Sequence, residues 1–223
     1  FIHNNSLRDL TTSREKIDWS RVFFAFALWG SISAFMIGTD YLFISPENYE
    51  WNFKFEQFLI LFLIVITLLP IQTSAEEYLF RGYWMQGLAV LTKNRWLPLV
   101  ITSVVFGAMH LANPEIDKLG YILLVHYIGT GFLLGIMTLM DEGLELALGF
   151  HAANNLVASI FVTADWTAFQ TNSLLKDTSE PSVAGFEVFI PVFIIYPLVL
   201  YVFSKKYNWV NWREKLFRKL IKD

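Results

Sequence analysis

The stretch "FLILFLIVITLLP" (Phe58–Pro70), followed by "TSAEEYLFRGYW" (Thr73–Trp84), decides the fold of this chain. The first segment is apolar enough for lipid, yet the second places Glu76, Glu77 and Arg81 directly beside it. A charged side chain costs about 2.5–3.5 kcal/mol at the centre of a membrane helix on insertion scales. An ionisable residue kept at that cost is a candidate for function.

The composition indicates a polytopic membrane protein. Of the 223 residues, 55% are hydrophobic and only 17% are charged, and the apolar residues form blocks long enough to cross a bilayer, which takes about 20 helical residues. The absence of cysteine excludes disulfides, thiolate chemistry and a cysteine-based zinc site. Because the chain begins at Phe1 without a methionine, we expect residues upstream of it.

The apolar blocks predict an all-α transmembrane bundle with six to seven spans. They lie at about 22–43, 55–73, 96–113, 119–140, 144–164 and 184–204, and a helical segment at 74–92 carries the charged motif. Everything at membrane depth is expected to be helical, because lipid cannot satisfy a strand edge. Pro70 should kink its helix, since proline removes a backbone hydrogen bond. Whether 55–92 is one kinked passage or two stays open at this point.

The chain is expected to form one domain with two basic ends. We divide it into an N-terminal flank (1–21), the bundle (22–204, with a motif core at about 55–165) and a basic amphipathic tail (205–223). Basic residues concentrate in the flank, in the loop 93–95 and in the tail: Arg8, Arg14, Lys16, Arg21, Lys93, Arg95, Lys205, Lys206, Arg213, Lys215, Arg218, Lys219 and Lys222. If 55–92 is one passage, these segments share one side, which the positive-inside rule makes cytoplasmic. The tail is expected to lie on an anionic membrane face or to bind another protein.

The first polar group in the bundle holds two carboxylates with different prospects. Glu77 and Arg81 are four residues apart on a helix and can form a salt bridge. Glu76 points about 100° away from that face. One carboxylate is therefore expected to be neutralised and structural, while the other faces a cavity. The alternative is a pair of solvated acids near a helix end.

Two further polar groups lie on other spans. His110 follows the small residues Gly107 and Ala108, while His151 and Asn155 are four apart and project the same way. Each group alone fits side chains that hydrogen-bond between membrane helices. Together with a carboxylate, they are the parts needed to activate a water and to stabilise an oxyanion.

The span at 119–140 holds a fourth histidine and a glycine pair. His126 has no partner at helical spacing, so we interpret it as a packing or chamber-lining residue. Gly131 and Gly135 form a G-x-x-x-G pattern, which predicts a helix-packing face.

The three polar groups resemble the motifs of a known family. "EEYLFR" fits E-E-x-x-x-R, "FGAMH" fits F-x-x-x-H and "HAANN" fits H-x-x-x-N. In this order they resemble the CPBP family, which comprises the type II CAAX prenyl endopeptidases and the bacterial Abi, or bacteriocin-processing, intramembrane proteases. The resemblance covers roughly 55–165. It implies a membrane-embedded endopeptidase, which is a peptidase and a hydrolase. The short chain, with little beyond the motif region, suggests a bacterial protein, so we expect it in the inner membrane with its basic termini in the cytoplasm.

The resemblance also implies a role for each motif residue. Glu76 would activate water, His110 would position or polarise it, and His151 and Asn155 would stabilise the oxyanion. Glu77 and Arg81 would brace the site. No cofactor is assigned, and a zinc site formed by Glu76, His110 and His151 is the alternative to a metal-free mechanism. The sequence has no H-E-x-x-H helix.

The expected partners are membrane lipid and a membrane-associated peptide or protein substrate, such as a bacteriocin or signalling precursor. A membrane protein partner fits as well, whereas we expect no nucleic acid. Two other functions stay open. The polar groups would fix helix register in a non-proteolytic scaffold or partner subunit, or would relay protons in a transporter. A transporter should show broken helices or internal repeats, and the sequence shows no repeat.

Overall fold

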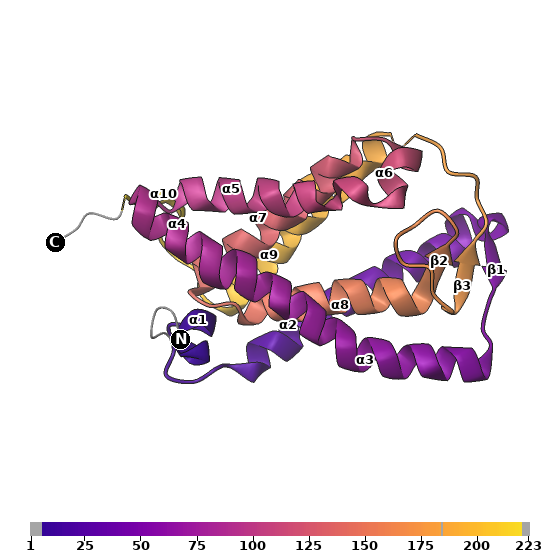
Figure 1. Cartoon of the computed structure of the whole chain (residues 1–223), viewed down its shortest axis with the longest axis horizontal. Coiled ribbons are helices and arrows are strands. Elements are labelled where there is room, and N and C mark those ends of the chain that lie inside the picture. The colour runs from indigo at the N-terminus through magenta and orange to yellow at the C-terminus, as the bar shows by residue number, and fades with distance from the viewer. Residues whose placement is uncertain (1–5, 184, 220–223) are drawn as a thin grey trace.

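The computed structural model describes residues 6–183 and 185–219, and most of these residues are helical (Figure 1). The α-helices are α1 (Leu7–Thr11), α2 (Trp19–Thr39), α3 (Phe55–Glu77), α4 (Met85–Thr92), α5 (Trp96–Ala108), α6 (Pro114–Leu119), α7 (Leu123–Asp141), α8 (Glu145–Phe161), α9 (Tyr196–Lys206) and α10 (Trp212–Phe217). The strands are β1 (Tyr49–Trp51), β2 (Val162–Ala164) and β3 (Leu175–Asp177). The prediction of a helical membrane bundle is confirmed.

Four helical stretches in the described part of the chain are long and apolar enough to cross a membrane: Trp19–Ile44, Phe55–Thr92, Leu123–Asp141 and Phe186–Lys206. The apolar stretch Trp96–Ala112 is shorter, and α8 has 17 residues. Six to seven spans therefore stays a prediction. Large apolar side chains are exposed along the long helices, among them Phe35, Ile60 and Phe193. Such an exposed apolar surface is typical of contact with lipid.

The stretch 55–92 is one continuous helix rather than two antiparallel passages. A π-helical turn, Tyr78–Trp84, joins α3 to α4 without a loop. The stretch has 38 residues, which corresponds to about 57 Å at the rise of an α-helix, and it changes direction between the two labelled helices (Figure 1). Pro70 lies inside α3. The π-helical turn contains Arg81, and such turns are frequent at functional sites.

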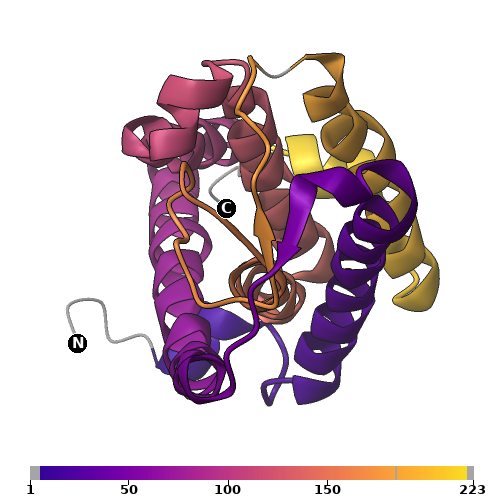
Figure 2. The same cartoon turned by 90° about the vertical axis from the view of Figure 1, so that its right-hand side faces the viewer.

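A small sheet closes one end of the bundle. Its strand order is β1-β3-β2, with β1 antiparallel and β2 parallel to β3, and it faces the reader in Figure 2. The predicted span 144–164 is wrong at its end, because α8 stops at Phe161 and 162–164 pair with β3. The β-branched Val162 and Thr163 favour extended backbone. Pairing with β3 satisfies backbone groups of 162–164 that lipid could not satisfy.

The basic segments share the other end of the bundle, where α1 and α10 lie (Figure 1). Asn94 pairs with Lys219 in an isolated bridge, and Arg95 donates to the carbonyl of Lys215. This placement agrees with the expectation that all basic segments lie on the same side of the membrane. The assignment of that side to the cytoplasm stays a prediction. The tail packs on the bundle, because Trp209 and Leu216 are buried in its core. Predictions that fall on residues 1–5, 184 and 220–223, including Lys222 of the basic tail, lie outside the described residues.

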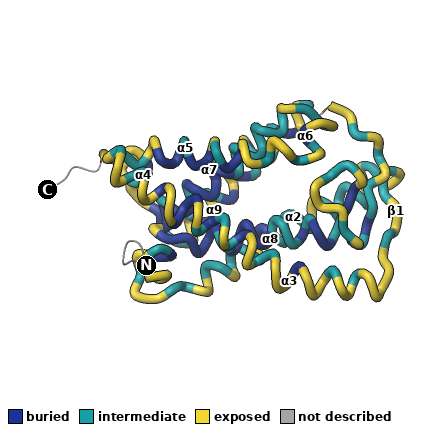
Figure 3. The backbone as a smooth tube through the Cα atoms, viewed as in Figure 1, coloured by how far each residue is buried: buried dark blue, intermediate teal, exposed yellow. Residues whose placement is uncertain are grey.

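Close helix contacts place α7 and α8 in the most buried part of the molecule (Figure 3). A Cβ atom on Gly131 would lie 2.8 Å from the Cα atom of Ser103, and one on Gly135 would clash with Leu99. The G-x-x-x-G packing face of α7 against α5 is thus confirmed. Gly149 allows α8 the same approach to the backbone of α2 at Val22. These contacts hold the helix that carries His151.

Candidate active site

Glu77 and Arg81 form a buried ion pair at the start of the π-helical turn. Both side chains are 0% exposed, and Arg81 Nη1 donates to Glu77 Oε1 over 2.9 Å. Arg81 Nη2 donates to the carbonyl oxygen of Gly131 on α7 over 3.1 Å. A buried pair needs such additional hydrogen bonds to offset its lost hydration. The salt bridge predicted from the four-residue spacing is confirmed. The guanidinium of Arg81 also contacts a second helix, α7.

His151 extends this pair to α8. Its Nδ1 lies 2.7 Å from Glu77 Oε1. Because an ionised carboxylate only accepts hydrogen bonds, Nδ1 is the donor and Nε2 is the free ring nitrogen. Nε2 lies 3.8 Å from Glu76 Oε2. The result is a chain of contacts in the order Arg81, Glu77, His151, Glu76.

Glu76 differs from its neighbour in exposure, as the sequence predicted. Its side chain is 27% exposed, whereas that of Glu77 is fully buried. Glu76 Oε1 accepts a hydrogen bond from Gln72, one turn earlier on α3. The oxygen Oε2 therefore remains to face His151. The two adjacent carboxylates are thus a buried, paired one and a partly exposed one.

Phe106 connects the second motif to the other two. The guanidinium carbon of Arg81 lies 4.5 Å from the centre of its ring, close enough for a cation–π contact. Its ring centroid lies 5.8 Å from that of His151 and 5.1 Å from that of His110. The Phe106 carbonyl oxygen lies 2.9 Å from His110 Nδ1. Since a carbonyl only accepts, His110 donates from Nδ1 and keeps Nε2 free.

The structure brings some of the predicted site residues together and leaves others apart. Glu76 and His151 are neighbours, and the Phe106 ring packs on both His151 and His110. Among residues 6–183 and 185–219, no hydrogen bond joins His110 or Asn155 to Glu76. Asn155 is half-buried one turn beyond His151 on α8, and its side-chain oxygen accepts from Asn154 over 3.2 Å. His126 packs against the rings of Tyr127 and Tyr196.

Sequence reasoning missed three residues around the site. Gln72 could have been found, because it precedes Glu76 by four residues on one helix. Tyr127, whose ring stacks on His110 with centroids 4.1 Å apart, gave no signal in sequence spacing. The carbonyl of Gly131, which accepts from Arg81, gave none either, since any residue has a carbonyl.

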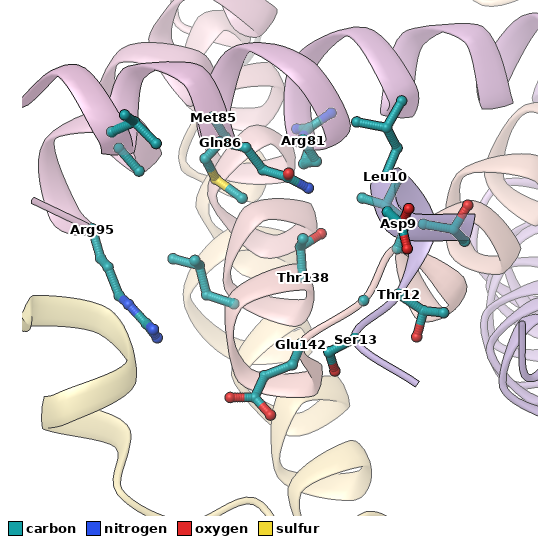
Figure 4. A pocket seen from close by; sticks show the side chains of 16 residues that line it. Asp9, Leu10, Thr12, Ser13, Arg81, Met85, Gln86, Arg95, Thr138 and Glu142 are labelled. Carbon is teal, nitrogen blue, oxygen red and sulfur yellow. The ribbon is translucent and has the colours of Figure 1, made fainter. Parts of the chain in front are cut away.

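A pocket of about 420 Å³ lies behind the ion pair. Leu10 of the N-terminal flank, Met85 of α4, and Thr138 and Glu142 at the end of α7 line it (Figure 4). Of the motif residues, Arg81 alone lines it. The pocket is therefore separate from the exposed side of Glu76.

The zinc alternative does not fit the side chains as they are placed. The described part of the chain contains no group of three His, Cys, Asp or Glu side chains arranged to hold a metal ion. His151 uses Nδ1 for Glu77, and within the described part of the chain no hydrogen bond or ion pair joins His110 to Glu76. A zinc site needs its ligand atoms about 2 Å from one point.

The fold and the site define a helical integral membrane protein with a buried Glu–Arg–His network. Residues 55–157 match the family described as type II CAAX prenyl endopeptidase Rce1-like, which is a family of peptidases. The resemblance predicted from the motifs is confirmed. The chain is also 34% identical over 164 residues to the uncharacterized protein YyaK of Bacillus subtilis (strain 168).

That alignment covers 73% of this chain and 54% of YyaK, so the chain spans about half the length of this relative. No solved structure matches the chain.

Proposed function

We propose that the chain is an intramembrane endopeptidase that hydrolyses a peptide bond of a membrane-associated peptide or protein. The observation that carries this proposal is the contact chain from Arg81 through Glu77 and His151 to Glu76. It sets a partly exposed carboxylate opposite an imidazole whose ring is held from behind. The peptidase family of residues 55–157 supports the same chemistry.

Glu76 is the general base in this proposal. The 3.8 Å between Glu76 Oε2 and His151 Nε2 is too long for a hydrogen bond, but one water can bond to both atoms. As the water oxygen attacks the scissile carbonyl carbon, Glu76 takes its proton and the carbonyl electrons move onto oxygen. The proton then passes from Glu76 to the leaving amine when the carbon–nitrogen bond breaks.

His151 and Asn155 stabilise the oxyanion that forms. With Nδ1 donating to Glu77, His151 can donate to the oxyanion only from Nε2, so it acts as an imidazolium. Asn155 projects from the same side of α8 one turn later and supplies an amide donor. His110 keeps Nε2 free and orients the water or the substrate.

The proposal is tested with the full chain in liposomes and a library of fluorogenic peptides that partition into membranes, with products identified by mass spectrometry. Glu76→Gln should fold as the wild type does and lose about 10²–10⁴-fold in cleavage rate. Glu56→Gln, on the exposed first turn of the same helix, is the matched control. If Glu76→Gln cleaves as fast as this control, Glu76 is not the base. If the wild type cleaves no peptide of the library, the scaffold function gains support instead.

A further inference from the structure

A second polar network lies next to His110 and outside all three motifs. The Tyr127 hydroxyl donates to Glu115 Oε1 over 2.6 Å, and Asn113 Nδ2 donates to the same oxygen over 3.0 Å. Glu115 is half-buried at the start of α6, while Tyr127 lies in the second turn of α7. The carboxylate thus ties α6 to α7.

This network fixes one face of the His110 ring. The rings of Tyr127 and His110 stack with centroids 4.1 Å apart and planes inclined by 17°. The His110 Nδ1 is held by the Phe106 carbonyl. With one face covered and one nitrogen bound, the ring cannot turn about its Cβ–Cγ bond without losing both contacts. The direction of the free Nε2 is therefore set by Tyr127, whose own hydroxyl is held by Glu115.

The same carboxylate holds a loop. Glu115 Oε2 accepts a hydrogen bond from the backbone N–H of Ala168 over 3.0 Å. Ala168 is exposed, in the segment between β2 and β3 that lies at the same end of the molecule as α6 (Figure 1). The segment is bonded internally, because Thr163 Oγ1 donates to the Phe169 carbonyl and accepts from the Thr171 N–H. It therefore meets Glu115 as one unit.

We propose that Glu115 and Tyr127 are positioning residues for His110, and that Glu115 couples the 165–171 loop to the orientation of the His110 ring. Displacement of the loop, for example by a substrate, removes one of the hydrogen bonds that hold the Glu115 carboxylate. The tyrosine and the imidazole stacked on it then lose their fixed orientation. The consequence for catalysis rests on the proposed function, whereas the positioning itself can be tested without a substrate.

The first test is nitrogen NMR of the full chain in liposomes with ¹⁵N-labelled histidine, the His110 signals being assigned with His110→Gln. Tyr127→Leu removes the stacked ring and should shift or broaden both His110 signals. Tyr127→Phe keeps the ring and should restore the signals in part. Tyr121→Phe, at an exposed tyrosine, is the control and should leave them unchanged. Unchanged His110 signals in Tyr127→Leu would overturn the positioning role.

The second test is hydrogen exchange at the Ala168 amide. Glu115→Ala should raise the exchange rate about tenfold, because a hydrogen bond to a charged group is lost. Asp117→Asn, on the exposed face of α6, is the control. An exchange rate equal to that of the control would refute the coupling of the loop.

Where cleavage is measurable, Tyr127→Leu should lower kcat while KM stays within about twofold, with partial rescue in Tyr127→Phe. Absence of cleavage in the wild type would count against the proposed function, while the NMR and exchange results would still decide the positioning.

Discussion

At the scale of the residue, Glu77 meets two demands with one oxygen. Its Oε1 accepts from both Arg81 and His151, while its Oε2 is buried and has no hydrogen-bond partner among the described residues. The negative charge on this carboxylate is what allows a guanidinium to be fully buried beside it. Glu77 therefore serves stability and the orientation of His151 at once.

We expect Glu77→Gln to lower the folded yield and the melting temperature in detergent. The loss of the negative charge leaves Arg81 unpaired at 0% exposure, and breaking a buried ion pair costs about 3–5 kcal/mol. Glu76→Gln is the matched control, because Glu76 is partly exposed and, among the described residues, Arg81 pairs with Glu77 instead. Equal melting temperatures for the two variants would contradict the structural role of Glu77.

The residue scale also shows what sequence reasoning can reach. The Glu77–Arg81 pair was predictable because both residues lie on one helix at a fixed spacing. The contact between Glu77 and His151 joins residues 74 positions apart, and helix packing alone creates it. Motif order predicted that the two belong to one site, but not which nitrogen of His151 faces which carboxylate.

At the scale of the element, close packing of α5 against α7 carries part of the site. Gly131 brings the two backbones together, and its carbonyl accepts from Arg81. A side chain at this position would push α7 away from Ser103 and would move that carbonyl with it. The packing of two helices and the binding of the guanidinium therefore depend on the same residue.

Gly131→Ala should destabilise the protein by about 1–3 kcal/mol, the usual cost of overpacking. Gly87→Ala is the control, because a Cβ atom there meets nothing within 4 Å and alanine favours a helix. Thermal unfolding in detergent measures both. If Gly131→Ala melted at or above the temperature of Gly87→Ala, the close packing of α5 against α7 at Gly131 would not contribute to stability.

The existence of the helices was predictable from the sequence because each apolar block is long. The ends of the helices and the small sheet were harder to predict. Each strand has three residues, too few for a periodic pattern to stand out from the loops around it. Pairing between segments more than a hundred residues apart, such as Tyr49 with Asp177, has no local signal. Contacts between segments that are distant in sequence therefore determine where these strands form.

At the scale of the whole molecule, the two flanks of the bundle meet at the turn between α7 and α8. Arg14 bonds to Asp141 over 3.0 Å and to Glu145 over 3.3 Å, and Arg21 pairs with Asp141 as well. The indole nitrogen of Trp209 donates to Asp141 over 3.1 Å. Both carboxylates are almost fully buried. This terminal network holds the start of the helix that carries His151.

Arg14→Gln should destabilise the protein by about 3–5 kcal/mol, because it leaves buried carboxylates short of a cation. Lys16→Gln, at an exposed lysine two residues later, is the control. Melting temperature and the rate of tryptic cleavage in the N-terminal flank measure the effect. Identical behaviour of the two variants would show that the terminal network does not hold the flank.

The terminal network also has a mechanical consequence. Tension applied to residues 6–21 or to residues 207–219 is transmitted to Asp141 and Glu145, and from there through less than two turns of α8 to His151. A neighbouring protein that bound either flank would therefore act on the orientation of His151 from the end of the bundle where the basic segments lie.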